Sequence, residues 1–405
     1  MILSNARLIF PEGIRDDLEV LVEEGKIAAI RPPAPRLRRA GEQTRVRQKG
    51  VIDLGGNYLA PGFIDLHVHG ALGHDTMEGS VEAFQAICDY HSSGGTTSLL
   101  LTTTTAPIQK LVEVLNAVQD CVKRTASIRP VRRCPAIAGV HVEGPFISNA
   151  KCGAQRAEFI QNPSSASVRQ LLDYADVIKR ITIAPELQGA PEAIENFYAH
   201  GISVSGGHSD AWDEEAREGF ARGMRSVTHT FNCMSSARRR GIYRVGGLLE
   251  FALGEPQIGC ELIADGHHVL PTLMKMLYRA KSSGGICLVT DATAGAGLPD
   301  GSEFSLFGRK CVVEGGVCLL ADRSALAGSA SRMIDLVRTM TAKADVPLHE
   351  AVTMATLSPA RAVGFDTKGR LEVGSDADLV VLSPGLDVLR TFTGGEEIWP
   401  GNGTA

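Results

Sequence analysis

The chain has 405 residues, 44% of them hydrophobic, which is enough for one large core and a smaller companion domain. Its formal net charge of -5 argues against nucleic acid or a membrane surface as a partner, because both select for a broad basic face. Nine scattered cysteines without a C-x-x-C pair indicate reduced thiols. The N-terminus lacks an export signal and no apolar stretch reaches the roughly 20 residues of a membrane span, so we expect a cytoplasmic protein.

Short strands and turns are predicted for residues 1–57, which we assign to a small β domain. Residues 18–23 and 26–30 are two candidate strands around the hairpin-like break Glu24-Gly25. Residues 31–50 are rich in proline and arginine and predict a solvated loop.

Residues 58–356 alternate between apolar runs and longer helical stretches, the pattern of parallel βα units. Eight such runs favour a closed (β/α)8 barrel over an open sheet. In the last helical stretch, Met333, Leu336, Val337 and Met340 share one face that we expect to pack on the barrel. The eight runs are Gly62–His69, Thr96–Thr103, Ala136–Glu143, Arg180–Ala184, Ile202–Ser205, Ser226–His229, Gly259–Ala264 and Gly285–Thr290.

Residues 357–405 return to short strands, with candidates in Gly369–Leu382 and Val388–Thr393. Strand-rich segments on both sides of a barrel predict that the two ends pair into one domain. The predicted fold is therefore α/β: a TIM barrel over 58–356 and a small β-sandwich built from 1–57 and 357–405.

Ionisable side chains gather where the predicted barrel strands end, which is where the active sites of such barrels lie. In a strand, His67 and His69 face the same side and can hold one metal ion together. Imidazoles and carboxylates without a cysteine cluster indicate a divalent metal, zinc as first choice, with iron, cobalt and manganese as alternatives. The further candidates at strand ends are Glu143, His208, His229, His268 and Asp291.

The number of ions is one or two. Four histidines and Glu143 exceed the ligands that one hydrolytic metal needs, and two metals bridged by Glu143 would use them all. Asp291 beside such a site can take a proton from attacking water and return it to the leaving group. It could instead be a plain metal ligand, cap the next helix, or serve as ligand and base together. Gly295 and Gly297 suggest a loop close to substrate.

Seven motifs occur along the chain: Pro61-Gly-Phe-Ile-Asp-Leu-His-Val-His-Gly, His141-Val-Glu-Gly-Pro-Phe-Ile, Gly207-His-Ser-Asp-Ala, Thr228-His-Thr-Phe-Asn-Cys-Met, Ile263-Ala-Asp-Gly-His-His-Val, Leu288-Val-Thr-Asp-Ala and Met354-Ala-Thr-Leu-Ser-Pro-Ala-Arg-Ala-Val-Gly. Together they resemble the N-acetylglucosamine-6-phosphate deacetylases of the amidohydrolase superfamily, from about residue 50 to the end. His-x-His marks the superfamily, and His-x-Glu-Gly-Pro-Phe with Ala-Asp-Gly-x-His narrows it to the deacetylases.

The resemblance implies metal-dependent hydrolysis of the acetamido group of an amino-sugar phosphate, which gives acetate and the free amine. Some family members replace the two histidines of the first strand and bind one metal, but this chain keeps both. The roles implied are Glu143, His208 and His229 for the principal metal, His67 and His69 for a second, Asp291 as general base and then acid, His268 on the sugar or phosphate, and backbone amides of Asn232 and Cys233 toward the substrate.

Two segments depart from the family. Where members carry Gly-Ala-His, this chain has Gly153-Ala154-Gln155, and Gln155 can still donate a hydrogen bond to an acetyl carbonyl although it cannot be cationic. Arg240 falls at the spacing of the family arginine that reaches a partner subunit's phosphate site, which predicts a homodimer, but its flanking residues differ. The alternates are Arg238, Arg239 and Arg244, and a run of arginines is also typical of a solvated surface.

Two alternatives stay open. One is an amidohydrolase acting on another substrate: the galacto epimer, an unphosphorylated sugar or a cyclic amide. The absence of a lysine in the fourth run counts against the cyclic amide, because related enzymes bridge their metals with a modified lysine there. The other is a non-catalytic binding module, which is disfavoured because the chain retains the ligands and the base.

Overall fold

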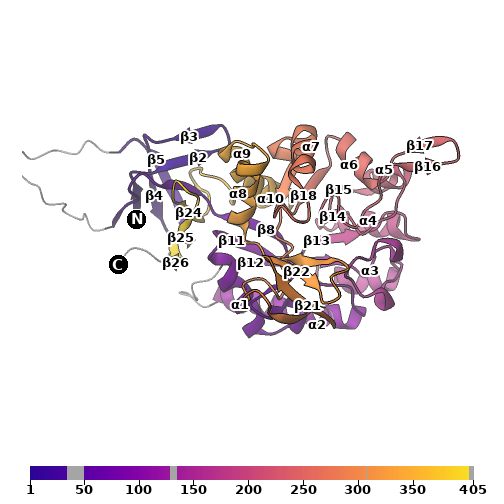
Figure 1. Cartoon of the computed structure of the whole chain (residues 1–405). Coiled ribbons are helices and arrows are strands. Elements are labelled where there is room, and N and C mark those ends of the chain that lie inside the picture. The colour runs from indigo at the N-terminus through magenta and orange to yellow at the C-terminus, as the bar shows by residue number, and fades with distance from the viewer. Residues whose placement is uncertain (34–49, 128–134, 307, 401–405) are drawn as a thin grey trace, which may run out of the picture.

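The computed structural model describes residues 1–33, 50–127, 135–306 and 308–400 (Figure 1). Most of the predicted loop over 31–50 lies outside the described residues. Eight parallel strands form one sheet in the order β19-β18-β15-β14-β13-β12-β11-β8. Each overlaps one of the eight predicted runs, which confirms that prediction. The strands are β8 Phe63–Val68, β11 Thr96–Thr102, β12 Ala136–Glu143, β13 Ile178–Ile183, β14 Ser203–Gly206, β15 Met224–Val227, β18 Gly259–Leu262 and β19 Ile286–Leu288.

The sheet closes into a barrel because its two edges meet just beyond β19. Val68 forms a parallel bridge with Ala292, and the amide of Asp291 donates to the carbonyl of His67 at 2.9 Å. The amide of His69 donates to the carbonyl of Ala292 at 2.8 Å. The closure brings the first histidine pair and Asp291, far apart in sequence, to the same seam. A (β/α)8 barrel rather than an open sheet is thus confirmed.

Helices follow the barrel strands and cover the cylinder. The predicted apolar face of α8 is confirmed, since Met333, Leu336, Val337 and Met340 are all fully buried. Burial of each such side chain stabilises the fold by about 1.5–3 kcal/mol. The helices are α1 Val81–Ser92, α2 Ile108–Ser127, α3 Ser165–Leu172, α4 Ala190–Ala199, α5 Asp213–Arg222, α6 Leu248–Gly254, α7 Pro271–Lys281, α8 Met333–Lys343, α9 Leu348–Ala355 and α10 Leu357–Ala362.

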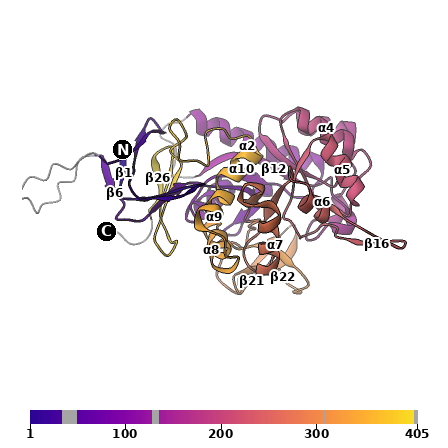
Figure 2. The ribbon, with the colours of Figure 1, turned by 90° about the horizontal axis from the view of Figure 1, so that it is seen from above.

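The two ends of the chain share a β-rich region beside the barrel (Figures 1 and 2). One sheet has the order β5-β4-β1-β6 and the other β26-β25-β24-β7-β2-β3. In the second sheet β7 lies between β2 and β24, so strands from both ends pair as predicted. The strands are β1 Ile2–Ser4, β2 Arg7–Phe10, β3 Gly13–Arg15, β4 Glu19–Glu23, β5 Lys26–Arg31, β6 Val51–Asp53, β7 Tyr58–Pro61, β24 Leu379–Leu382, β25 Val388–Thr393 and β26 Glu396–Pro400.

The chain does not return to strands directly after residue 356. Helix α10 comes first, and its Ala360 packs in one buried cluster with Ile64 and Leu66 of β8, while β24 begins only at Leu379. The apolar side of α10 therefore belongs to the barrel core. The exact limits of the domains stay predictions.

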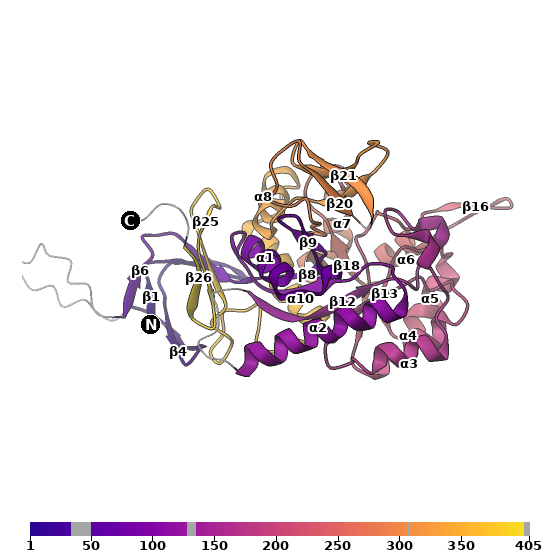
Figure 3. The same ribbon diagram turned by 90° about the horizontal axis from the view of Figure 1, so that it is seen from below.

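A four-stranded antiparallel sheet between β19 and α8 was not predicted (Figure 3). An added Cβ at Gly295 would lie 2.6 Å from Cys318 Sγ and from a ring carbon of Phe304, and one at Gly297 would lie 2.7 Å from Leu72 and Tyr90. Both glycines thus serve close packing, a different reason from the substrate loop that the sequence suggested. The strands are β20 Glu303–Leu306, β21 Arg309–Glu314, β22 Val317–Leu320 and β23 Leu326–Ser329.

Two global expectations can be compared with the described part of the chain. Its eight cysteines all carry free thiols, as expected. Among the helices within the described ranges, none combines the length and apolar character that crossing a bilayer requires.

Candidate metal centre

The six residues predicted to bind metal or move protons come together at the carboxyl ends of the barrel strands. They belong to β8, β12 and the segments that follow β8, β14, β15 and β19. Within each of two groups, the ligand atoms lie within 4.8 Å of one another. The Glu143 group consists of Glu143, His208 and His229, and the His67 group consists of His67, His69 and Asp291.

In the Glu143 group, Glu143 Oε1 lies 3.2 Å from His208 Nε2 and 3.1 Å from His229 Nε2, and the two Nε2 atoms are 3.1 Å apart. The Nδ1 atoms of His208 and His229 face the backbone carbonyls of Lys151 and Asn232 at 2.8 and 3.2 Å. Because a carbonyl only accepts, each Nδ1 donates, which leaves Nε2 as the ring nitrogen that faces the centre and can bind a metal. Two imidazole nitrogens and a carboxylate oxygen at these distances make a donor set for a divalent cation.

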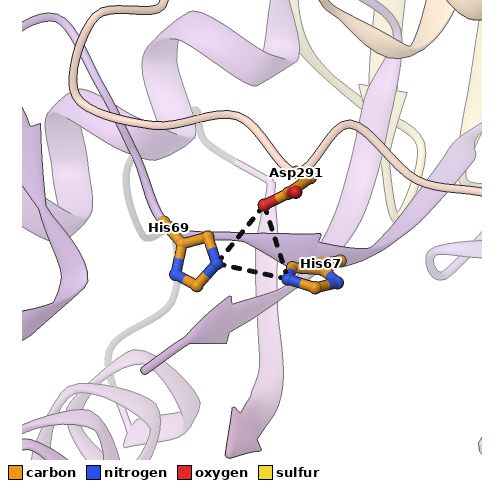
Figure 4. Close-up of side chains that lie close together, drawn as sticks. All are labelled: His67, His69 and Asp291. Carbon is orange, nitrogen blue, oxygen red and sulfur yellow. Dashed lines mark hydrogen bonds and ion pairs between the residues drawn. The ribbon is translucent and has the colours of Figure 1, made fainter. Parts of the chain in front are cut away.

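The His67 group has the same character. His67 Nε2 and His69 Nε2 are 3.2 Å apart, and Asp291 Oδ1 lies 3.5 and 3.3 Å from them (Figure 4). The other ring nitrogen of His67, Nδ1, lies 3.2 Å from Glu261 Oε2, which fixes the orientation of the ring. This group also suits a divalent cation.

Glu143 lies between the two groups. Its Oε1 is 3.4 Å from His67 Nε2, in addition to its contacts with His208 and His229, and its Oε2 is 3.2 Å from His69 Nε2. One carboxylate therefore touches the nitrogen donors of both groups. This is the placement that a carboxylate bridging two metal ions requires.

The electrostatics of the centre favour positive charge. Burial opposes protonation of His67 and His69, yet the neighbouring carboxylates outweigh it, raising the pKa of His67 well above its ordinary value and that of His69 to about 9. Burial alone would raise the pKa of Asp291, but the two imidazoles lower it to about 2. The pKa of Glu143 lies well below its ordinary value because His67 and His208 outweigh its burial. Carboxylates held ionised in a buried site provide the charge that a cation needs.

Three of the six residues have left-handed backbones. His208, His229 and Asp291 have φ values of 45°, 29° and 48°, a region that residues other than glycine rarely adopt. Such conformations persist only where surrounding contacts hold them, and they gather at functional sites. The local strain therefore supports a functional role for these loops independently of the side-chain geometry.

Sequence reasoning missed a buried ion pair below the centre. Glu261 of β18 and Arg180 of β13 are each 1% exposed, and Arg180 Nε lies 2.8 Å from Glu261 Oε1. The Arg180 guanidinium and His67 outweigh burial and lower the pKa of Glu261 well below its ordinary value. The available signals were Glu261 inside an otherwise apolar predicted run and Arg180 at the start of another.

Asp65 was missed as well. Its carboxylate accepts the hydroxyl of Thr290 at 2.6 Å and the Thr290 amide at 3.2 Å. Burial raises the pKa of Asp65 to about 7. Because Thr290 precedes Asp291, Asp65 holds the segment that carries the proposed base.

Gln155 lies beside Glu143 and is 6% exposed. Its Nε2 donates to Glu143 Oε2 at 2.7 Å, and its Oε1 accepts the Thr105 amide at 2.8 Å. The amide orientation is fixed because the Thr105 N–H needs an acceptor. Ala154 packs against the core of the four-stranded sheet β20–β23. Contacts of Gln155 and Ala154 with substrate stay predictions.

The remaining candidates differ in outcome. His268 lies near the centre, where Asp265 accepts its Nδ1 proton at 2.6 Å; this bond and the charges of Asp265 and Asp291 outweigh burial and raise the pKa of His268. The amide of Asn232 donates to the carbonyl of His229 at 2.9 Å, and its contact with substrate stays a prediction. The loop after β15 therefore forms a tight turn between His229 and Asn232. The role of the Cys233 amide stays a prediction.

Arg240 lies on a hairpin, β16 Arg238–Arg240 and β17 Tyr243–Val245, that projects from the body of the molecule (Figures 2 and 3). Its guanidinium pairs with Glu214 and stacks over Trp212, 4.8 Å from the ring centre. Within one chain, the structure therefore does not bring Arg240 to the two metal groups.

Residues 58–398 match the model of the Amidohydrolase family. The barrel, the two clusters of histidine and carboxylate donors and this match together define the class: a hydrolase that uses a divalent metal.

Full-length relatives specify the family. The chain is 32% identical to N-acetylglucosamine-6-phosphate deacetylase of Lysinibacillus sphaericus over 98% of this chain and 97% of the relative. It is also 32% identical to N-acetylgalactosamine-6-phosphate deacetylase of Escherichia coli O157:H7, over 98% of each. A mutant N-acetyl-D-glucosamine-6-phosphate deacetylase of Mycobacterium smegmatis, solved with N-acetyl-D-glucosamine-6-phosphate, has a TM-score of 0.87 and 26% identity over 98% of this chain and 99% of that one. The chain belongs to the N-acetylglucosamine-6-phosphate deacetylase family.

Proposed function

We propose that this chain hydrolyses the acetamido group of N-acetylglucosamine 6-phosphate, giving glucosamine 6-phosphate and acetate. The observation that carries the proposal is the convergence of the five proposed ligands and Asp291 into two groups joined by Glu143, in a chain that matches named deacetylases along its length. Every ligand and the base that the resemblance implies are present.

The Glu143 group holds the principal metal and the His67 group a second one. Zinc is the first choice because three-ligand sites of imidazole and carboxylate suit it, with iron, cobalt and manganese as alternatives. A bound divalent cation supplies Lewis acidity, which polarises the amide carbonyl and makes water more acidic.

Asp291 acts as general base and then as general acid. It is 15% exposed at its side chain, more than any other of the six residues, so water and substrate can reach it. Its carboxylate takes a proton from water as the water oxygen attacks the amide carbon. Asp291 then gives that proton to the amine nitrogen as the carbon–nitrogen bond breaks, and acetate and the free amine leave.

Binding of the amino-sugar phosphate involves further residues. His268, whose pKa the contact with Asp265 raises against the effect of burial, suits an anionic or hydroxyl-bearing part of the substrate. Two hydrogen-bond donors lie near the acetamido group of the substrate: the side chain of Gln155, which has Ala154 beside it, and the backbone amide of Cys233. Arg240 reaches the phosphate of a neighbouring subunit in a homodimer, which is consistent with its place on a projecting hairpin.

Two alternatives stay open, and one of them has support of its own. The first alternative is another N-acetyl amino sugar: the galacto epimer, for which the relative from Escherichia coli O157:H7 is named, or an unphosphorylated sugar, which no relative supports. A non-catalytic binding module on the same fold is the second, but intact ligands and base disfavour it.

The test compares acetate release from N-acetylglucosamine 6-phosphate, its galacto epimer and unphosphorylated N-acetylglucosamine, with enzyme of measured metal content. We expect the highest kcat/KM for the first. A higher kcat/KM for the galacto epimer or for the unphosphorylated sugar would identify that sugar as the substrate instead. If metal-loaded protein released no acetate from any of the three sugars, the proposal of a deacetylase would be contradicted.

A further inference from the structure

A buried side-chain network lies directly beneath the two metal groups and has no part in the mechanism above. Glu261 is on β18 and Arg180 on β13, strands that are not neighbours in the sheet, so the two side chains meet across the barrel interior. Both are 1% exposed. A charged pair at this depth is retained only with well-placed partners, because removing two charges from water is unfavourable.

The partners of Arg180 are all within the barrel. Its Nε lies 2.8 Å from Glu261 Oε1, its second terminal nitrogen donates to Ser205 Oγ at 3.0 Å, and its first donates to Ser203 Oγ at 3.4 Å. These contacts fix one oxygen of Glu261 and direct the other toward the metal groups.

The second oxygen of Glu261 touches both groups. It lies 3.2 Å from His67 Nδ1 and accepts the backbone amide of His229 at 3.2 Å. The contact with His67 is to a side chain, whereas the contact with His229 is to the main chain. Replacement of Glu261 therefore changes the ring of His67 directly but leaves the ring of His229 with its own anchor, the Asn232 carbonyl.

We propose that Glu261, held by Arg180, is the positioning residue that makes His67 a metal ligand, an inference that rests on the metal roles proposed above. Glu261 accepts the Nδ1 proton of His67, so Nε2 is the ring nitrogen that faces His69 and Asp291 and that a cation would bind. Arg180 balances the charge of Glu261, so the pair orients the ring without adding net charge below the cation.

Glu261→Gln tests this at constant volume. The amide oxygen of the new side chain would face Arg180, and its NH2 group would donate to His67 Nδ1, which places the ring proton on Nε2. We expect the wild-type protein, stripped by chelator and titrated with zinc, to bind two ions per chain by elemental analysis. The variant should bind one ion as tightly as before and the other roughly 10–100-fold more weakly.

Two control variants show which zinc ion is weakened and whether the loss of Glu261 causes the weakening. His69→Ala should remove the same ion, and Ser203→Ala, which touches only the far side of Arg180, should leave both. If circular dichroism shows that Glu261→Gln does not fold, the same zinc titration is done on the double variant Arg180→Met with Glu261→Met. This variant removes both charges of the buried pair, so no unpaired charge is left in the barrel.

Two ions of unchanged affinity in the folded variant would overturn the proposal, as would equal loss of both or a single ion in the wild-type chain. Because zinc counting needs no substrate, a wild-type chain that binds two ions but releases no acetate would contradict only the proposed function.

Discussion

The two metal groups are alike in composition but differ in what holds their histidines. In the Glu143 group, His208 and His229 each donate Nδ1 to a backbone carbonyl, and both have left-handed backbones. In the His67 group, His67 lies in a regular strand and donates to a side chain, Glu261. The first group is therefore held by loop conformation and the second by a charge pair that spans the barrel.

This difference has a consequence for substitution. A backbone carbonyl remains whatever the side chain, so the anchors of the Glu143 group are insensitive to single replacements. The anchor of the His67 group is a side chain, and loss of one member of a buried ion pair costs about 3–5 kcal/mol. We therefore expect the His67 group to be the more easily altered of the two.

The largest effect is expected for Asp291→Asn. The amide cannot take the proton from water, so kcat should fall roughly 10⁴-fold, the upper range of general acid–base catalysis. The ion of the Glu143 group should remain, since Asp291 contacts only the other group. Turnover and metal content measured on one preparation check this, and near-normal turnover would refute the acid–base role.

Paired ligand replacements compare the two groups directly. His229→Ala should lower kcat roughly 10³-fold through loss of the principal ion, whereas His69→Ala should lower it about 10–100-fold. His200→Ala, at an exposed histidine that ends α4, is the matched control and should have no effect. Steady-state kinetics with metal analysis decide the order; a larger loss for His69→Ala would reverse the assignment of the principal metal.

Gln155→Ala probes the carboxylate shared by both groups. It removes the Gln155 donor from Glu143 Oε2 and leaves the Thr105 amide without its side-chain acceptor, which costs about 2 kcal/mol. We expect kcat/KM to fall roughly 30-fold, with weaker zinc binding at both groups. Gln85→Ala removes a comparable bond to Asp89 on the surface of α1 and should leave kinetics and zinc binding unchanged. An unchanged zinc affinity in Gln155→Ala would show that Gln155 acts on substrate alone.

The smallest effect is expected for Arg240→Ala, which lies outside both groups. KM for the phosphorylated sugar should rise roughly tenfold, while KM for the plain sugar stays the same. Arg222→Ala, at an exposed arginine paired with Glu195 and Glu218, serves as the control. Equal changes of KM for both sugars would contradict a contact between Arg240 and the substrate phosphate.

Short sequence patterns were enough to predict several features of the fold. Eight apolar runs with helical stretches between them predicted the barrel strands, and the spacing of Met333, Leu336, Val337 and Met340 predicted the buried face of α8. Because barrels place strand ends at one mouth, His67 and Glu143 could be assigned to one site without coordinates. The sheet β20–β23 could not be assigned, since its short strands lie where the barrel pattern predicts a loop and helix.

The amino-acid sequence by itself determined the barrel, the pairing of its two ends and the set of six ionisable residues that meet at the barrel mouth, because these depend on periodicity and on which side chains end strands. Only the tertiary structure decided that Glu143 lies between two groups, that the Asn232 amide is already bonded, and that Arg180 meets Glu261. Each of these depends on contacts between segments far apart in the chain, which no local pattern records.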